Sequence, residues 1–183
     1  MEYKTYFDRA KVVWQMEARS IQKLERGIDP ISFNTVVTEI KECLQRKCRI
    51  YITGKGTSGA VGEKIAHTLC CVDIPASFIS IGVGVNAAMG LLQKGDILVI
   101  ISKGGNTEDV VKLIKPCAKK GAKVLGVTSN PASQLGLKSD ILLKVSVERE
   151  VDEKNSLATA STVAMIAAFD AIAVAFQEMV DKK

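Results

Sequence analysis

Two segments of the chain combine glycine with hydroxyl side chains just before a stretch of helical spacing. The first reads Gly54-Lys55-Gly56-Thr57-Ser58-Gly59, and the second reads Ser102-Lys103-Gly104-Gly105-Asn106-Thr107. Glycine lets the backbone approach a phosphate closely, and the start of a helix supplies free N–H groups with partial positive charge. In the second segment the two glycines can expose N–H donors as an anion nest, beside the hydroxyls of Ser102 and Thr107. Both segments therefore predict contacts to a phosphate.

Each segment also has a simpler interpretation. The first matches the dinucleotide pattern G-x-G-x-x-G, which requires an acidic residue at the end of the second strand. The nearest acid, Asp73, precedes that strand, so NAD binding is disfavoured and no cofactor is expected. The first segment can also be a tight turn, and Asn106 or Thr107 can be a plain helix N-cap. A cap explains one such loop more easily than two loops on neighbouring strands.

Candidate acid–base groups lie further along the chain. Glu148-Arg149-Glu150 follows the last predicted strand, and a hydroxyl-rich stretch, 155–162, follows it. A carboxylate at a strand end that faces a phosphate site is a candidate general base. The spacing is equally consistent with a solvated loop whose acids pair with Arg149. For His67, the single histidine, a structural role on a helix is favoured, and a catalytic role would require a subunit interface.

The elements that must position these residues alternate between strand and helix. Apolar strands are predicted at 48–53, 76–80, 96–102, 123–128 and 141–147, and helices at 60–71, 87–92, 107–120 and 156–180, with a helical turn at 131–137. Strands that are apolar throughout indicate a parallel sheet covered on both faces. The pattern predicts a doubly wound, five-stranded α/β sandwich of the flavodoxin-like type, which binds ligands beyond the carboxyl ends of its strands.

The N-terminal region, residues 1–47, predicts two helices outside this sheet, at 2–26 and 31–47. They are expected to pack on the domain formed by residues 48–183 or on a partner subunit. Together with the long apolar C-terminal helix they favour self-association, because a lone sandwich leaves such helices partly uncovered. A homodimer or homotetramer is expected.

Composition narrows the class of protein. The 183 residues carry 25 basic and 20 acidic side chains, a mild surplus spread along helix faces, so a nucleic-acid partner is not expected. Five cysteines without a C-x-x-C pair, and one histidine, predict no metal site and reduced thiols in the cytoplasm. The apolar stretch 164–176 is interrupted by Asp170 and is interpreted as a buried helix too short to span a membrane.

The stretch from Ile50 to Phe176 resembles the SIS (sugar isomerase) domain, and the helical N-terminus is similar to that of the arabinose-5-phosphate isomerase branch. The resemblance rests on four segments: 52–59, 101–107, 126–131 and 148–162. It implies that Ser58 and the loop from Ser102 to Thr107 hold a sugar phosphate. It also implies that Glu150 lies near the sugar carbons and that active sites form between subunits.

The chain departs from the family pattern at three positions in these loops. Gly104 replaces the second serine of the Ser-x-Ser-Gly-x-Thr loop, Asn106 replaces its glutamate, and Thr57 replaces a lysine common in the first loop, although Lys55 is near. The segment after the second strand, where relatives often carry histidine, has none. The regulatory domain pair of longer isomerases is not expected within these 183 residues.

The favoured hypothesis is a metal-independent isomerase that interconverts arabinose 5-phosphate and ribulose 5-phosphate, with Glu150 as the base. A binding module without catalysis, such as a phosphosugar sensor, is the alternative. A 3-hexulose-6-phosphate isomerase is a second enzymatic alternative.

Overall fold

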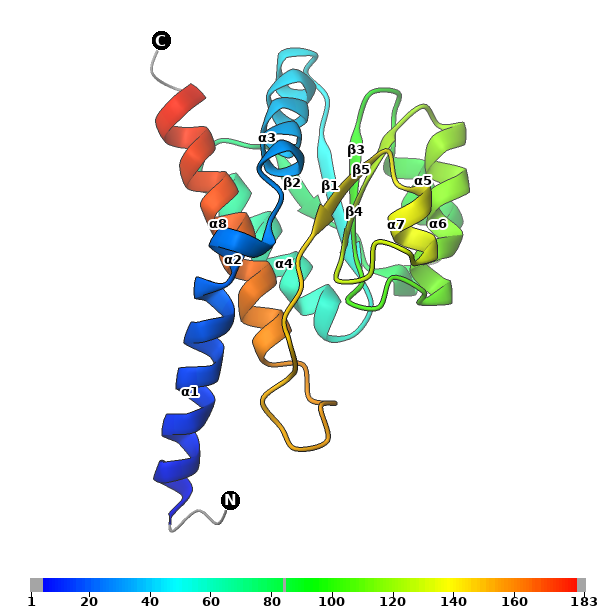
Figure 1. The fold of residues 1–183 in the computed structure, drawn as a ribbon. Coiled ribbons are helices and arrows are strands. Elements are labelled where there is room, and N and C mark those ends of the chain that lie inside the picture. Colours follow the sequence, from blue (N-terminus) through cyan, green and yellow to red (C-terminus); the bar gives the residue numbers. More distant parts are fainter. Residues whose placement is uncertain (1–4, 84, 181–183) are drawn as a thin grey trace.

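Five parallel strands form one sheet, in the order β2-β1-β3-β4-β5, in the computed structural model, which describes residues 5–83 and 85–180 (Figure 1). The strands are β1 (Ile50–Gly54), β2 (Ala76–Phe78), β3 (Ile97–Ile101), β4 (Lys123–Thr128) and β5 (Ile141–Lys144). The order reverses direction between β1 and β3, as in doubly wound sheets of the flavodoxin type. The predicted fold class is confirmed.

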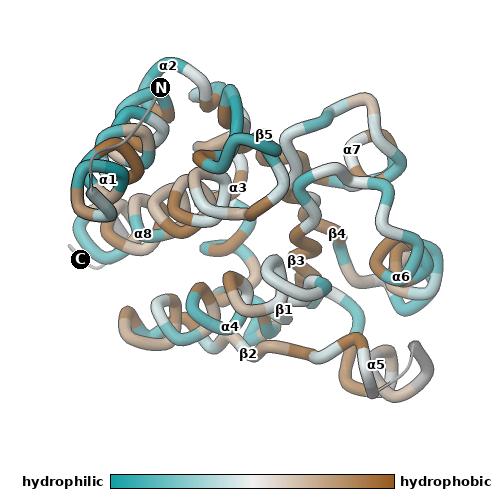
Figure 2. The backbone as a smooth tube through the Cα atoms, turned by 90° about the horizontal axis from the view of Figure 1, so that it is seen from below, coloured by the Kyte–Doolittle hydropathy of each residue, from teal (hydrophilic) through white to brown (hydrophobic). Residues whose placement is uncertain are grey.

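Helices cover both faces of the sheet. They are α1 (Tyr6–Gln22), α2 (Leu24–Gly27), α3 (Pro30–Gln45), α4 (Thr57–Cys70), α5 (Val85–Leu91), α6 (Glu108–Lys119), α7 (Gln134–Lys138) and α8 (Ala160–Val180), with a 3-10 turn at Ile81–Val83. Viewed from below, the hydrophobic strands β3 and β4 lie between the two layers of helices (Figure 2). The molecule is a three-layer sandwich.

Alternation along each buried strand divides the core into two parts. Ile50 and Ile52 of β1 join the cluster formed with α3, α4 and α8, whereas Tyr51 joins the cluster formed with α5 and α6. Successive side chains of a strand point to opposite faces, so one apolar strand supplies both clusters.

The N-terminal helices divide into two kinds. α3 begins at a cap in which the Asp29 carboxylate accepts a hydrogen bond from Ser32 N (2.8 Å), with Pro30 at the first helical position, and it buries Val36 and Ile40 in the core. α1 buries no residue and extends beyond the sheet alongside α8 (Figure 1).

Several helices and strands begin or end at other residues than predicted. The helix predicted at 2–26 is interrupted at Lys23, and residues 2–4 lie outside the described residues. The last helix begins at Ala160 instead of 156, because residues 152–157 form a turn in which the Asp152 carboxylate accepts from the backbone N–H groups of Ser156 and Leu157. The last strand ends at Lys144 instead of 147.

The apolar part of the last helix is longer than the stretch 164–176 identified from the sequence. Within the described residues α8 is the one helix long and apolar enough, over Ala160–Met179, to span a membrane by length and composition, so the estimate of a length too short to span was wrong. Half of that stretch is buried inside the fold, against α1, α3 and α4. A core helix of a globular domain has these properties as well.

Candidate functional site

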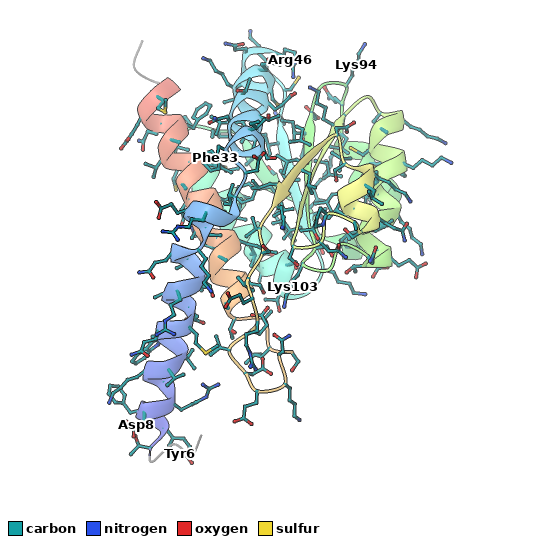
Figure 3. The ribbon with its side chains drawn as sticks, in the orientation of Figure 1. Tyr6, Asp8, Phe33, Arg46, Lys94 and Lys103 are labelled. Carbon is teal, nitrogen blue, oxygen red and sulfur yellow. The ribbon has the colours of Figure 1, made fainter. Side chains whose placement is uncertain are left out.

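The two glycine-rich loops meet at the carboxyl edge of the sheet. β1 and β3 are neighbours, with Gly54 paired to Ile101, so Lys55 and Ser102 follow adjacent strands at the same edge. Lys103 lies at this edge, at the opposite end of the sheet from Lys94 (Figure 3). The switch point of the sheet therefore falls between the two loops, where ligands bind in such folds.

The first loop turns sharply into α4. Gly56 has φ +58° and ψ −128°, a backbone conformation essentially restricted to glycine, and it precedes Thr57 and Ser58 in the first helical turn. The Lys55 ammonium lies 2.5 Å from Asp109 Oδ2 on α6, and this pairing lowers the pKa of Asp109. The exposed ion pair connects the first loop to the helix that follows the second loop.

The second loop is closed by its own hydroxyl groups. The buried Ser102 Oγ lies 3.2 Å from Thr107 Oγ1 and accepts a hydrogen bond from Gly105 N, also at 3.2 Å. Asn106 Oδ1 accepts from Gln134 N (2.9 Å), so Asn106 secures the start of α7. Gly104 is exposed, and a Cβ added there meets nothing within 4 Å. The loop leaves Gly104 open to a ligand.

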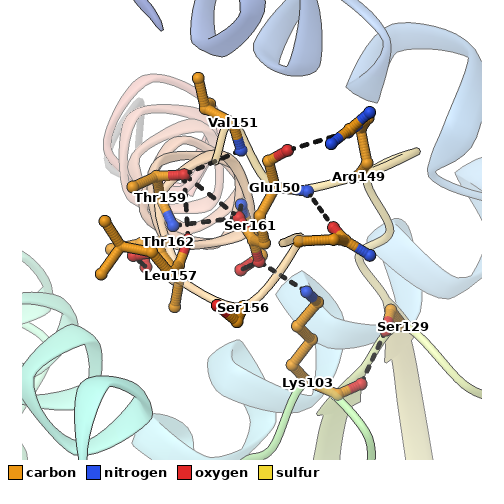
Figure 4. Close-up of polar contacts among 12 residues, drawn as sticks. Lys103, Ser129, Arg149, Glu150, Val151, Ser156, Leu157, Thr159, Ser161 and Thr162 are labelled. Atoms are coloured by element: carbon orange, nitrogen blue, oxygen red, sulfur yellow. Dashed lines mark hydrogen bonds and ion pairs between the residues drawn. The ribbon is translucent and has the colours of Figure 1, made fainter. Parts of the chain in front are cut away.

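Lys103 has a fixed backbone within this loop. Its carbonyl oxygen accepts three hydrogen bonds from the end of β4: from Ser129 N (3.0 Å), Ser129 Oγ (2.7 Å) and Thr128 Oγ1 (2.9 Å). Its side chain is 40% exposed and crosses to Glu150, with Nζ 2.6 Å from Oε1 (Figure 4).

Glu150 is a buried carboxylate with donors on both oxygens. Oε2 accepts from the backbone N–H groups of Thr159 (3.0 Å) and Ser161 (3.1 Å), at the start of α8, and Oε1 accepts from the Ser161 hydroxyl as well as from Lys103. Asn155 Oδ1 accepts from Glu150 N at 2.6 Å. The carboxylate thus joins the second loop to the beginning of α8.

These donors decide the protonation of Glu150. Burial by itself raises the pKa of the carboxyl group, but the Lys103 ammonium, the Ser161 hydroxyl and the two N–H groups outweigh burial and lower the pKa to about 2. In this arrangement Glu150 is ionised at neutral pH and is a weak base.

His67 lies apart from the two loops in its own chain. It is exposed near the end of α4, ten residues beyond Thr57, which corresponds to about 15 Å of helix. Its Nδ1 lies 3.8 Å from Cys71 Sγ. A direct role for His67 in a site formed by these loops requires a second copy of the chain.

Three residues inside the segments singled out from the sequence were not selected individually as site residues. Lys103, Thr159 and Ser161 contact Glu150, although Lys103 is 47 residues away from it. The signal present in the sequence was the lysine inside the second glycine-rich loop, but no pattern indicated its partner.

The fold and the loops define a doubly wound α/β protein whose candidate site lies at the switch point between β1 and β3. The chain belongs to the SIS domain family, which matches residues 43–175. The resemblance stated from the sequence is confirmed.

The chain is similar in sequence to curated proteins named as arabinose 5-phosphate isomerases. An arabinose 5-phosphate isomerase of Francisella tularensis, KdsD, is 30% identical over 93% of this chain and 52% of its own length. A protein of Haemophilus influenzae described as a probable arabinose 5-phosphate isomerase is 33% identical over 92% of this chain and 49% of its own length. The chain spans about half the length of these curated relatives.

The fold of the chain is also similar to that of solved structures. A protein of Listeria monocytogenes, described as a candidate sugar-phosphate isomerase, is 39% identical, with a TM-score of 0.93 over 100% of this chain and 94% of its own. A protein of Escherichia coli CFT073, solved in complex with arabinose 5-phosphate, has a TM-score of 0.90 over 100% of this chain and 95% of its own. At 21% sequence identity, this similarity shows a shared fold only.

Proposed function

We propose that this chain is a sugar-phosphate isomerase, with arabinose 5-phosphate and ribulose 5-phosphate as the favoured substrate pair. The observation that carries the proposal is the contact between Glu150 and Lys103, because it holds a buried carboxylate against the loop expected to bind the phosphate. Relatives named arabinose 5-phosphate isomerase support the substrate pair.

The phosphate is assigned to the edge of the sheet where the two loops follow β1 and β3. Ser58, Ser102 and Thr107 offer hydroxyl donors there, and the backbone N–H of the exposed Gly104 is open to an oxygen of the ligand. The first turn of α4 adds unpaired N–H groups and partial positive charge behind Thr57. Lys55, which pairs with Asp109, lies in the first loop beside these groups.

The isomerisation moves one proton between neighbouring carbons. A base removes the proton on C2 of the open-chain aldose, and the oxygen on C1 takes up a proton, which yields an enediol. The oxygen on C2 then loses its proton and C1 receives one from the conjugate acid of the base, which yields the ketose. The reaction needs no external oxidant or reductant. We assign the base to Glu150, the buried carboxylate nearest to the second loop.

The experiment is incubation of the protein with arabinose 5-phosphate while ribulose 5-phosphate is followed by NMR. Conversion that is lost in Glu150→Gln and kept in Glu148→Gln supports the proposal. Glu148 is a suitable control because it lies two residues away, is exposed and pairs with Lys23. Conversion that survives in Glu150→Gln excludes Glu150 as the base.

A second function, binding of a sugar phosphate without turnover, is favoured by one observation. The Glu150 carboxylate is already held by Lys103 and by backbone and hydroxyl donors of Thr159 and Ser161, and it has a pKa of about 2, so it is a weak base in this state. A binding module predicts thermal stabilisation by arabinose 5-phosphate without conversion. If neither effect appears, the phosphorylated substrates of the 3-hexulose-6-phosphate isomerase reaction are tested next.

We also propose that the protein acts as a homodimer or homotetramer. α1 exposes three large side chains at seven-residue spacing, Phe7, Trp14 and Ile21, on a helix that buries none of its residues. Seven residues are two helical turns, so the three side chains share one face. Sedimentation or light scattering measures the assembly.

A further inference from the structure

We propose that Lys103 is a positioning residue that leaves Glu150 for the phosphate group of a bound sugar phosphate, so that occupancy of the loop frees Glu150 to act. The inference rests on the proposed function and deepens it. The backbone of Lys103 belongs to the second loop, and its side chain contacts the candidate base, Glu150.

The backbone of Lys103 is fixed, whereas its side chain has freedom to move. Three hydrogen bonds to the carbonyl oxygen, from Thr128 and Ser129, hold the residue against the end of β4. The ammonium group is at the end of a flexible four-carbon stem, and the side chain is 40% exposed. A different position of the ammonium therefore requires only rotation about side-chain bonds.

Glu150 keeps its remaining partners when the ammonium departs. Its carboxylate still accepts from Thr159 N, Ser161 N and the Ser161 hydroxyl. A carboxylate can accept about four hydrogen bonds, so the loss of one leaves it bonded and in place. Two arrangements of the ammonium are thus available without unfolding of the segment that precedes α8.

A sugar phosphate interacts differently with the two arrangements. A phosphate monoester carries a charge of about −1.5 to −2 near neutral pH and has three strong acceptor oxygens. A phosphate bound at Ser102 and Gly104 lies beside the residue that carries the ammonium, since both flank Lys103. The dianion attracts Lys103 more strongly than a monoanionic carboxylate that donors of Thr159 and Ser161 already satisfy. A ligand shifts an equilibrium only through such a differential interaction.

Movement of the cation changes the chemistry of Glu150. Burial raises the pKa of Glu150, and the Lys103 ammonium is one of the groups that lower it. When the ammonium departs, the proton affinity of the carboxylate therefore rises. A base with a higher proton affinity abstracts a proton more readily. The binding of the phosphate and the strength of the base are then coupled through one side chain.

The test follows the carboxyl carbon of Glu150 by ¹³C NMR while inorganic phosphate is added to the full chain. The protein is labelled at glutamate side chains, and the resonance is assigned from its absence in Glu150→Gln. Binding is measured in the same samples by calorimetry. We expect phosphate to move the Glu150 resonance in the unmodified protein and to leave it unmoved in Lys103→Met, which binds phosphate roughly tenfold more weakly.

Two further variants separate positioning from folding. Lys103→Arg keeps the charge and is expected to keep the phosphate-dependent movement of the resonance. Lys64→Met removes a lysine of matched exposure, 41%, that pairs with Asp170 on α8, and it is expected to behave as the unmodified protein does.

The outcomes distinguish the inference from the function that it deepens. If phosphate binds but the Glu150 resonance stays in place, or moves equally in Lys103→Met, the inference is overturned while the proposed function stands. If neither inorganic phosphate nor arabinose 5-phosphate binds, the phosphate site itself is wrong and both proposals fall.

Discussion

The ammonium of Lys103 lies 2.6 Å from Oε1 of Glu150 and joins two segments that are 47 residues apart in the chain. One segment follows β3 and the other precedes α8, so the pair connects the loop expected to hold a phosphate to the carboxylate expected to act on the sugar. The chemical role of this pair and its contribution to stability are separable by experiment.

Replacement of Glu150 by glutamine is expected to reduce turnover of arabinose 5-phosphate by roughly 10²–10⁴-fold, the range for loss of a general base. Binding of the sugar phosphate is expected to persist, because the hydroxyl groups of the two loops are untouched. NMR measures turnover and calorimetry measures binding. Equal loss of both quantities would assign Glu150 to the structure of the site instead of to the proton transfer.

The stability of the fold is expected to depend on pH through Glu150. Its pKa is about 2 in the folded protein and about 4.5 when unperturbed. A carboxylate with a lowered folded-state pKa stabilises the fold above the unperturbed value, and this contribution is lost as pH falls toward 2. The difference corresponds to about 3 kcal/mol.

The measurement for this pH dependence is urea denaturation of the unmodified protein and of Glu150→Gln between pH 5 and pH 2. The unmodified protein is expected to lose more unfolding free energy over this range, by about 3 kcal/mol. Parallel pH profiles would show that the donors around Glu150 do not lower its pKa in solution.

Substitution of Gly105 by alanine is expected to destabilise the fold by at least about 2 kcal/mol. Gly105 has φ +71°, and an added Cβ would lie 1.9 Å from Ser133 Oγ, which caps α7. Gly104→Ala is the matched control, since its Cβ meets nothing within 4 Å and its φ is not positive. Chemical denaturation of the two variants compares them, and similar stabilities would contradict the described loop geometry.

Removal of the Ser102 hydroxyl is expected to weaken the binding of arabinose 5-phosphate. Ser102→Ala loses a donor to the phosphate and also the acceptor for Gly105 N, so the loop relaxes as well. A loss of roughly tenfold in affinity is expected for one hydrogen bond to a charged group. Ser20→Ala, on α1, is the control, because Ser20 Oγ donates to Met16 O within its own helix. Unchanged affinity in Ser102→Ala would show that the phosphate does not bind at the second loop.

Replacement of His67 by alanine is expected to leave turnover within a few-fold of the unmodified protein, because His67 is exposed about 15 Å along α4 from the first loop. A larger loss would indicate a role in the site of a second copy. Mixing His67→Ala with Glu150→Gln would then restore activity in mixed oligomers.

Local patterns in the sequence were sufficient for the architecture. Apolar strands such as Ile97–Ile101 alternate with helical spacing, and this alternation leaves few arrangements other than a parallel sheet covered on both faces. The glycine-rich loops were also readable, because the edge of a parallel sheet gathers the segments that follow its strands. The start of α8 at Ala160 could not be predicted from the sequence, because hydrogen bonds of Asp152 and Glu150 decide where that helix begins.

The amino-acid sequence by itself thus determined the layers, the order of the elements and the pair of loops at the switch point. Tertiary structure alone decided that Lys103 meets Glu150, that His67 lies away from both loops in its chain, and that Asn106 secures α7. The physical reason is that periodicity reports which side of an element is buried, which is a local property. A contact across 47 residues depends on how the chain packs in three dimensions.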